Sequence, residues 1–132
     1  AVRERNDTAG FGPWSVKDGI IHVAPPIAVL DQMVTLRVHL DDCADDNAPL
    51  IVALGSHRLG KVAADSVEAA AGQHPIYACH ANAGDVWAYA TPILHTSAKS
   101  VSDRRRRVLQ LDYSASDLPN GLEWLGVARA DT

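Results

Sequence analysis

The chain has 132 residues, 47% of them apolar, and a formal net charge of −4. This length allows one domain with one core, and the acidic balance, without a basic stripe, argues against nucleic-acid binding. No segment reaches the ~18 to 20 apolar residues that span a bilayer, and no signal peptide is visible. We therefore expect a single cytoplasmic domain without membrane contact, in which Cys43 and Cys79 are free thiols.

The first third of the sequence changes from irregular to strictly alternating. Glycines and prolines punctuate residues 1–31, which predicts a loop-rich region with one short strand at 19–23 and a helical turn at 27–33. Residues 33–42 then alternate, so that one face carries Thr35, Arg37 and His39 and the other carries only apolar side chains, a pattern typical of a strand. We expect the apolar face in the core and the polar face in a wet cavity. The alternative is a polar face in bulk solvent.

Short elements follow one another over the rest of the chain. A turn is predicted at 43–49, a strand at 50–54, a turn at 55–57 and a short helix at 63–72 that ends at Gly72. Further strands are predicted at 75–81, 85–94 and 106–114, before a loop tail in which Trp124 packs back. Many short strands with one small helix indicate an all-β barrel or sandwich.

Several motifs resemble a known family when they are taken together. They are Leu40-Asp41-Asp42, Asn47, Gly55-Ser56-His57, Gly84-Asp85, His95 with Ser97, Arg106 eleven residues after His95, and the segment GPWSVKDGIIHVAPP at 12–26. In this combination the chain resembles the phytanoyl-CoA dioxygenase family of non-haem iron, 2-oxoglutarate-dependent oxygenases, in a bacterial subgroup. Ala48, Leu54 and Ser100 depart from the family pattern and concern the geometry of turns more than chemistry.

The resemblance implies a fold and two bound cofactors. The fold would be a double-stranded β-helix, or jelly roll, with 1–31 loop-rich, 32–113 forming barrel strands and 114–132 as the tail of one domain. Such enzymes hold Fe(II) with two histidines and one carboxylate, and His95 would be the distal histidine. Arg106 would bind the far carboxylate of 2-oxoglutarate through its planar guanidinium, and Ser102 could add a hydroxyl. The remaining cavity-lining candidates are Thr35, Arg37, His39, Asn47 and His22.

Some of these candidates also have simpler interpretations. Asn47 suits the formation of a turn better than the wall of a cavity, and His22 fits a packed loop equally well. Arg104, Arg105 and Arg107 are expected to be solvated or ion-paired at the start of their strand.

The family's other two iron ligands form a His-x-Asp pair. In the subgroup that this chain resembles, the pair lies a few residues before the segment AVRER, so we expect the chain to be a fragment whose barrel is incomplete at its N-terminal side. Alone it would be inactive, and its unpaired strand edges predict a homodimer or strand exchange. His39-Leu40-Asp41 is itself a His-x-Asp sequence, and with His95 it is the one in-chain alternative.

Three hypotheses therefore stay open. The first is a dioxygenase that hydroxylates a small organic substrate, with its missing ligands outside this chain. The second is a non-catalytic jelly-roll binding module with an anion site at Arg106. The third is a cupin-like metalloenzyme that uses His39, Asp41 and His95. Loss of iron in His39→Ala would favour the third, and dicarboxylate binding without metal would favour the second. The sequence does not identify the substrate.

Overall fold

The computed structural model describes residues 1–126, and the chain divides into two compact units. Unit 1 comprises Ala1–Gln32 and the chain from Ser114 onward, and unit 2 comprises Met33–Tyr113. No helix within residues 1–126 is both long and apolar enough to cross a membrane.

Unit 1 is built on a β-hairpin. Strand β1 (Trp14–Lys17) pairs with β2 (Ile20–Val23), and the turn between them places Asp18 and Gly19 at φ values of 51° and 78°. Two successive positive φ values give the turn the twist of a tight antiparallel hairpin. The helical turn α1 (Ile27–Leu30) follows, as predicted. Val2 forms a bridge with Trp124, and Val2, Leu118 and Leu122 make a small core, so the predicted packing of Trp124 is confirmed.

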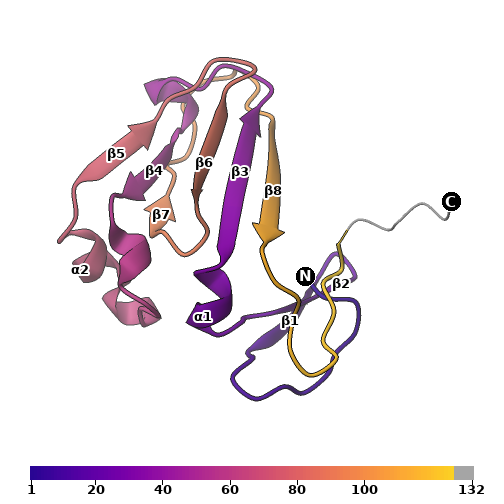
Figure 1. Cartoon of the computed structure of the whole chain (residues 1–132). Helices are drawn as coiled ribbons and strands as arrows, with labels where there is room; N and C mark the ends of the chain where they lie inside the picture. The colour runs from indigo at the N-terminus through magenta and orange to yellow at the C-terminus, as the bar shows by residue number, and fades with distance from the viewer. Residues whose placement is uncertain (127–132) are drawn as a thin grey trace, which may run out of the picture. The chain divides into compact units, whose positions relative to one another are not determined.

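Unit 2 contains two three-stranded sheets (Figure 1). One has the order β6-β3-β8, from β3 (Met33–His39), β6 (Val86–Ala90) and β8 (Val108–Ser114). The other has the order β5-β4-β7, from β4 (Leu50–Ala53), β5 (Ile76–Cys79) and β7 (His95–Thr96). Hydrogen-bonded neighbours are mostly not consecutive in sequence, because the chain passes back and forth between the two sheets. The fold is the jelly-roll type that the sequence predicted.

Short helical segments occupy the connections of unit 2. They are η1 (Asp45–Asn47), η2 (Ser56–Arg58), η3 (Ala64–Ser66) and α2 (Val67–Ala71). Helix α2 ends at Gly72, whose N–H donates to the carbonyl of Glu68, and this confirms the predicted short helix. Strands β1 and β7 were not predicted, since a two-residue strand such as β7 has no periodicity to recognise.

The two sheets of unit 2 contribute different chemistry to the interior. Leu50, Val52, Cys79 and Ile93 form the buried apolar core, and three of them lie on or beside β4 and β7. Strand β3 instead buries its polar face: Thr35 is 2% exposed and His39 is 1% exposed.

The prediction that the apolar face of β3 packs in the core is therefore wrong. Val34 and Leu40 on that face are 40% and 51% exposed. The polar face can be buried because Thr35 finds partners inside: its hydroxyl donates to Asp112 Oδ1 at 2.7 Å and lies 3.0 Å from Thr91 Oγ1. A hydrogen-bonded hydroxyl loses little free energy on burial.

Candidate active site between the two sheets

The inward face of β3 presents a row of polar side chains toward two aromatic residues of β6. The antiparallel register pairs Thr35 with Tyr89 and Arg37 with Trp87. Directly paired residues lie on the same face of a sheet, and Trp87 and Tyr89 pack against the buried core. Arg37 therefore shares the interior side of this sheet with both aromatic rings.

His39 continues this row and is almost completely buried. Neither of its ring nitrogens has a hydrogen-bond partner among residues 1–126. Burial lowers the pKa of His39, and the positive charges of Arg37 and Arg106 lower it further, against a smaller opposing effect of Asp85. The imidazole is thus held in its neutral form between two guanidinium groups.

Arg106 lies just before β8 and is half-buried. Its Nη1 donates to the carbonyl of Ala48, and it forms no ion pair within the described part of the chain. The neighbouring Arg107 differs, because its guanidinium binds both oxygens of Asp41 at 3.0 and 2.8 Å. This hydrogen bonding lowers the pKa of Asp41 to about 2. Of the other two arginines in residues 104–107, Arg104 pairs with Asp46 and Arg105 is exposed. Arg106 is therefore a half-buried cation of this segment without a carboxylate partner in residues 1–126.

His95 belongs to β7 in the other sheet and is paired with Val52 of the core. This pairing turns its side chain toward the interior, where its ring centroid lies 6.2 Å from that of Tyr89. Nδ1 lies 2.8 Å from the carbonyl oxygen of Ile93. A carbonyl only accepts, so Nδ1 carries the proton and Nε2 of the neutral ring keeps its lone pair. The residue is exposed, which leaves Nε2 accessible to a further group.

A cavity of about 580 Å³ lies against the same aromatic residues. Its walls are mostly apolar, and the lining residues are Val52, Leu54, Gly55, His57, Tyr77, Cys79, Trp87, Ala88, Tyr89, Ala90 and Ile93. The rings of Tyr77 and Trp87 meet edge to face at 5.7 Å. Burial raises the pKa of Tyr89 and of Cys79, and Arg37 opposes both shifts. The guanidinium of Arg37 is therefore close enough to two of the lining residues to act on them electrostatically.

Two further predicted residues use their polar atoms elsewhere. Asn47 is fully buried, and its Nδ2 donates to the carbonyls of Asp42 and Arg105 while its Oδ1 accepts from Ser100. It therefore clamps a turn instead of lining a cavity. The hydroxyl of Ser102 accepts from the backbone N–H and Nε of Arg104, both at 3.1 Å.

His22 belongs to the hairpin of unit 1. Its Nδ1 lies 3.0 Å from the carbonyl of Ile20. This contact fixes the ring within its own strand, as in the packed interpretation that the sequence left open.

The in-chain metal site of His39, Asp41 and His95 is not formed. Residues 1–126 contain no group of three His, Cys, Asp or Glu side chains placed to hold a metal ion. Asp41 is bound to Arg107, and His39 and His95 lie in different sheets. The described residues therefore do not fit Fe(II) by themselves, whereas an uncompensated, half-buried arginine fits the carboxylate of a diacid.

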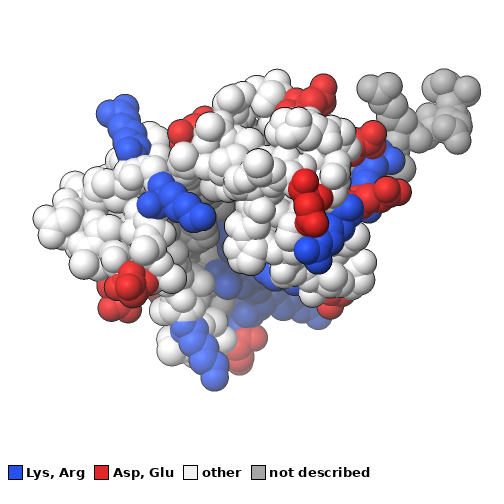
Figure 2. All heavy atoms as spheres, turned by 90° about the horizontal axis from the view of Figure 1, so that it is seen from below, with Lys and Arg blue, Asp and Glu red and all other residues white. Residues whose placement is uncertain are grey.

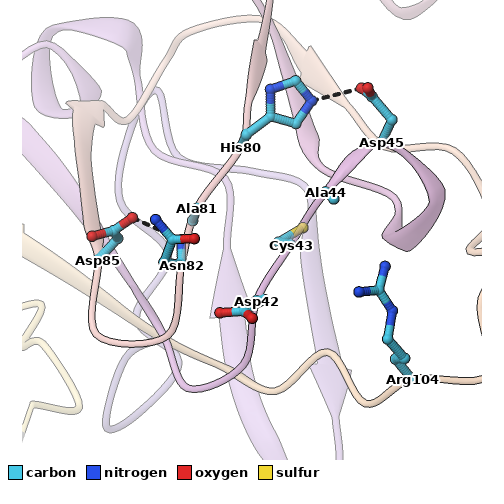
Figure 3. A pocket seen from close by; sticks show the side chains of 9 residues that line it. All are labelled: Asp42, Cys43, Ala44, Asp45, His80, Ala81, Asn82, Asp85 and Arg104. Atoms are coloured by element: carbon cyan, nitrogen blue, oxygen red, sulfur yellow. Dashed lines mark hydrogen bonds and ion pairs between the residues drawn. The ribbon is translucent and has the colours of Figure 1, made fainter.

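A second pocket, of about 410 Å³, is lined by side chains of the types that bind metals, among them Asp42, Asp45, His80 and Asp85 (Figure 3). Each carboxylate has a protein partner: Asp45 binds His80 Nε2 at 2.6 Å, Asp85 accepts from the N–H of Asn82, and Asp42 accepts from the N–H of Ala83. The contacts of Asp45 and Asp42 join the connections that follow β3 and β5, and that of Asp85 lies within the second connection. On the face drawn in Figure 2, acidic and basic side chains are interspersed.

Comparisons with known proteins identify a family for this chain. A model of the family described as phytanoyl-CoA dioxygenase (PhyH) matches residues 4–108. The crystal structure of EctD from S. alaskensis with bound Fe is 27% identical, has a TM-score of 0.57, and matches 64% of this chain and 32% of its own. The same values hold for EctD with 2-oxoglutarate and 5-hydroxyectoine.

A further solved structure shows the fold alone. AviO1 from Streptomyces viridochromogenes Tue57 is 23% identical with a TM-score of 0.62, over 85% of this chain and 47% of its own. The chain thus spans less than half the length of these solved relatives. None of the curated proteins matches it.

Proposed function

Because this chain belongs to the phytanoyl-CoA dioxygenase family, we propose that it is the part of an Fe(II)- and 2-oxoglutarate-dependent oxygenase that carries His95 and Arg106. The observation that carries the proposal is that two side chains, eleven residues apart in sequence, can each bind a further group. His95 keeps the lone pair of Nε2, and Arg106 keeps a charge that no carboxylate of residues 1–126 neutralises. Hydroxylation of a small organic substrate is the reaction that this family assignment supports.

Each residue has a defined role in the proposal. Arg106 binds the far carboxylate of 2-oxoglutarate, since a planar guanidinium can form two parallel hydrogen bonds to it. His95 contributes one neutral imidazole to the metal. The other two iron ligands come from residues outside 1–126, in accordance with the lack of a three-ligand group within them. The iron, once bound, would supply the activation of O₂.

The likeness to EctD supports this choice of cofactors. Solved structures of that protein are described with bound Fe and with 2-oxoglutarate and 5-hydroxyectoine. In this chain, we assign the hydrogen-bond donor for 2-oxoglutarate to Arg106 and the nitrogen ligand for iron to His95.

Substitution of Arg106 tests the cofactor assignment. We predict that wild-type protein binds 2-oxoglutarate saturably in isothermal titration calorimetry, and that Arg106→Ala weakens this binding by about 10- to 100-fold, the value of a charge-assisted hydrogen bond of ~1.5 to 3 kcal/mol. Arg105→Ala is the matched control, because Arg105 is an exposed neighbour. Equal losses in both variants would contradict the assignment.

A non-catalytic binding module is the second candidate, favoured by the missing metal group within residues 1–126. Metal analysis separates the two functions. In a polypeptide that contains this chain with its remaining ligands, the oxygenase proposal expects stoichiometric Fe(II), 2-oxoglutarate-dependent O₂ uptake, and loss of iron in His95→Ala but not in His39→Ala. Saturable 2-oxoglutarate binding in such a polypeptide without iron or O₂ uptake would favour the binding module.

A further inference from the structure

Arg37 is a second interior cation whose charge the described chain does not neutralise. Its Nε is buried without a hydrogen-bond partner, and its Nη1 lies 3.4 Å from Gln110 Oε1, a long contact with a neutral group. No ion pair of Arg37 is formed within residues 1–126. A partly buried guanidinium without a counter-charge loses hydration free energy that a bound anion can restore.

The nearby carboxylates of this sheet accept hydrogen bonds from groups other than Arg37. Asp112 accepts the hydroxyl of Thr35 at 2.7 Å, and Asp85 accepts the backbone N–H of Asn82 at 2.7 Å. Arg37 therefore has a buried Nε that the carboxyl group of a bound molecule could satisfy.

Arg37 and Arg106 are separated by His39. Each arginine acts electrostatically on the imidazole of His39, which is 1% exposed. The N–H of Leu40 donates to the carbonyl of Arg107, so Arg106 lies near the end of β3 beyond His39. Two guanidinium groups on either side of a neutral ring suit two separate anions better than one.

The residues around Arg37 indicate the chemical class of the molecule whose anionic group it would bind. Trp87 lies directly opposite Arg37 in the register, and Trp87, Tyr89 and Cys79 all line the apolar cavity of about 580 Å³. This volume is within the usual range for a small-molecule site. A guanidinium beside a largely apolar, partly aromatic cavity matches an organic acid with an apolar body.

We propose that Arg37 and this cavity form a second carboxylate subsite, separate from Arg106, that binds the organic substrate as a small apolar carboxylic acid. The inference rests on the proposed function, because it assigns the substrate class to the same interior. The apolar body occupies the space beside Tyr77 and Trp87, and the carboxylate binds Arg37.

Benzoate is a suitable probe, since it is a small carboxylate with a flat apolar body. Titration of wild-type protein should show saturable benzoate binding whose affinity changes less than twofold when 2-oxoglutarate is saturating. A ring-current shift of the indole N–H of Trp87 in NMR spectra should accompany binding, because this residue forms the cavity wall. The Trp87 signal is assigned with Trp87→Phe.

Two variants should show reciprocal losses. Arg37→Gln is expected to weaken benzoate binding at least tenfold and to leave 2-oxoglutarate binding within twofold of wild type. Arg106→Ala is expected to do the opposite. Arg37→Lys, which keeps the charge, should retain part of the benzoate affinity and shows whether loss in Arg37→Gln follows from misfolding.

The outcomes distinguish the two proposals. If 2-oxoglutarate binds but benzoate does not, or if the two compete in wild-type protein, the second subsite is overturned while the proposed function stands. If Arg37→Gln weakens 2-oxoglutarate as strongly as Arg106→Ala, both arginines hold one diacid and the subsite is again overturned. If neither probe binds, both proposals fail.

Discussion

Single buried residues determine how unit 2 responds to acid. His39 is the clearest case, because its ring nitrogens lack partners and its pKa is lowered by burial and by two arginines. The unfolded chain has an ordinary histidine pKa of about 6.5. Below that pH, His39 binds a proton in the unfolded state but stays neutral in the folded state. The free energy of unfolding therefore falls as the pH drops from about 6.5 toward the lower pKa of the folded state.

We predict a measurable acid slope from this one residue. Between pH 7.5 and 5.5, urea unfolding should lose stability at up to about 1.4 kcal/mol per pH unit from His39, the value for one proton. His39→Gln should remove that component of the slope. His22→Gln, in unit 1, is the matched control and should keep it. An unchanged slope in His39→Gln would mean that the ring is protonated in the folded state.

The hydrogen-bond partners around the candidate site were harder to predict than its residues. The spacing of His95 and Arg106 selected two residues whose binding capacity is unused. The hydrogen-bond partners of Asn47 and Ser102 could not be predicted, since they involve a carbonyl 58 residues away in one case and a flexible arginine in the other. Arg37 was expected in the cavity, but its unpartnered Nε depends on the exact positions of Gln110 and Tyr89.

Among the elements, the turn around η1 is held by several hydrogen bonds of one buried side chain. Asn47 is 0% exposed and joins the end of β3, the segment before β8 and Ser100. Alanine would leave two backbone carbonyls without this amide and open a small void.

We predict that Asn47→Ala lowers the free energy of unfolding by about 2 to 4 kcal/mol, the usual range for a buried, fully hydrogen-bonded polar group with its packing. Chemical denaturation monitored by circular dichroism measures the change. Ser66→Ala is the control, because its hydroxyl makes an exposed contact with Asp65 and should cost less than about 0.5 kcal/mol. A loss below 1 kcal/mol for Asn47→Ala would contradict the clamp.

The end of β3 is also tied to the start of β8 by a charged contact. Asp41 accepts from the backbone N–H and from two guanidinium nitrogens of Arg107, and the N–H of Leu40 donates to the carbonyl of Arg107. The pKa of Asp41 is lowered to about 2, so its stabilising effect is present above the ordinary carboxyl pKa and is lost as the pH falls from about 4 to 2.

We predict that Asp41→Asn speeds amide exchange at Leu40 at neutral pH, because the pairing of β3 with β8 opens more often. The same exchange rate in wild-type protein should rise as the pH is lowered through the titration of Asp41, after correction for intrinsic exchange. Asp103→Asn, an exposed acid in the same region, is the control. Unaltered exchange in Asp41→Asn would show that the backbone bond is maintained without the ion pair.

At the scale of elements, the positions of strands β3 and β8 could be predicted from the sequence. Which face of β3 is buried could not. Alternation alone located β3 and β8, as it reports which side chains share a face. It does not report which face is inside. That depends on Asp112 and Thr91, which lie 77 and 56 residues from Thr35 and satisfy its hydroxyl.

At the scale of the whole molecule, the outer face of sheet β6-β3-β8 is apolar and exposed. The register places Val34, Leu36 and Val38 beside Ala90, Ala88 and Val86 on that face, and the alternation of β8 adds Leu109 and Tyr113. Val86, Leu109 and Tyr113 are 52%, 49% and 52% exposed. A contiguous apolar patch of this kind favours association.

We predict that the 132-residue chain self-associates through this face in solution. Multi-angle light scattering should give a mass above 14.1 kDa that rises with concentration. The double variant Val34→Lys/Leu109→Lys should shift the mass toward the monomer. Val16→Lys, at a more exposed apolar position of the unit 1 hairpin, should not. A concentration-independent monomer in the wild type would refute this.

The burial of a polar strand face has a consequence for the chain in a cell. If Arg37 and Arg106 bind carboxylates as proposed, these ligands stabilise the folded state by mass action. A diacid present at a hundred times its dissociation constant adds about 2.7 kcal/mol to the folded state. Resistance of the chain to proteolysis is therefore expected to rise with added 2-oxoglutarate if Arg106 binds it as proposed.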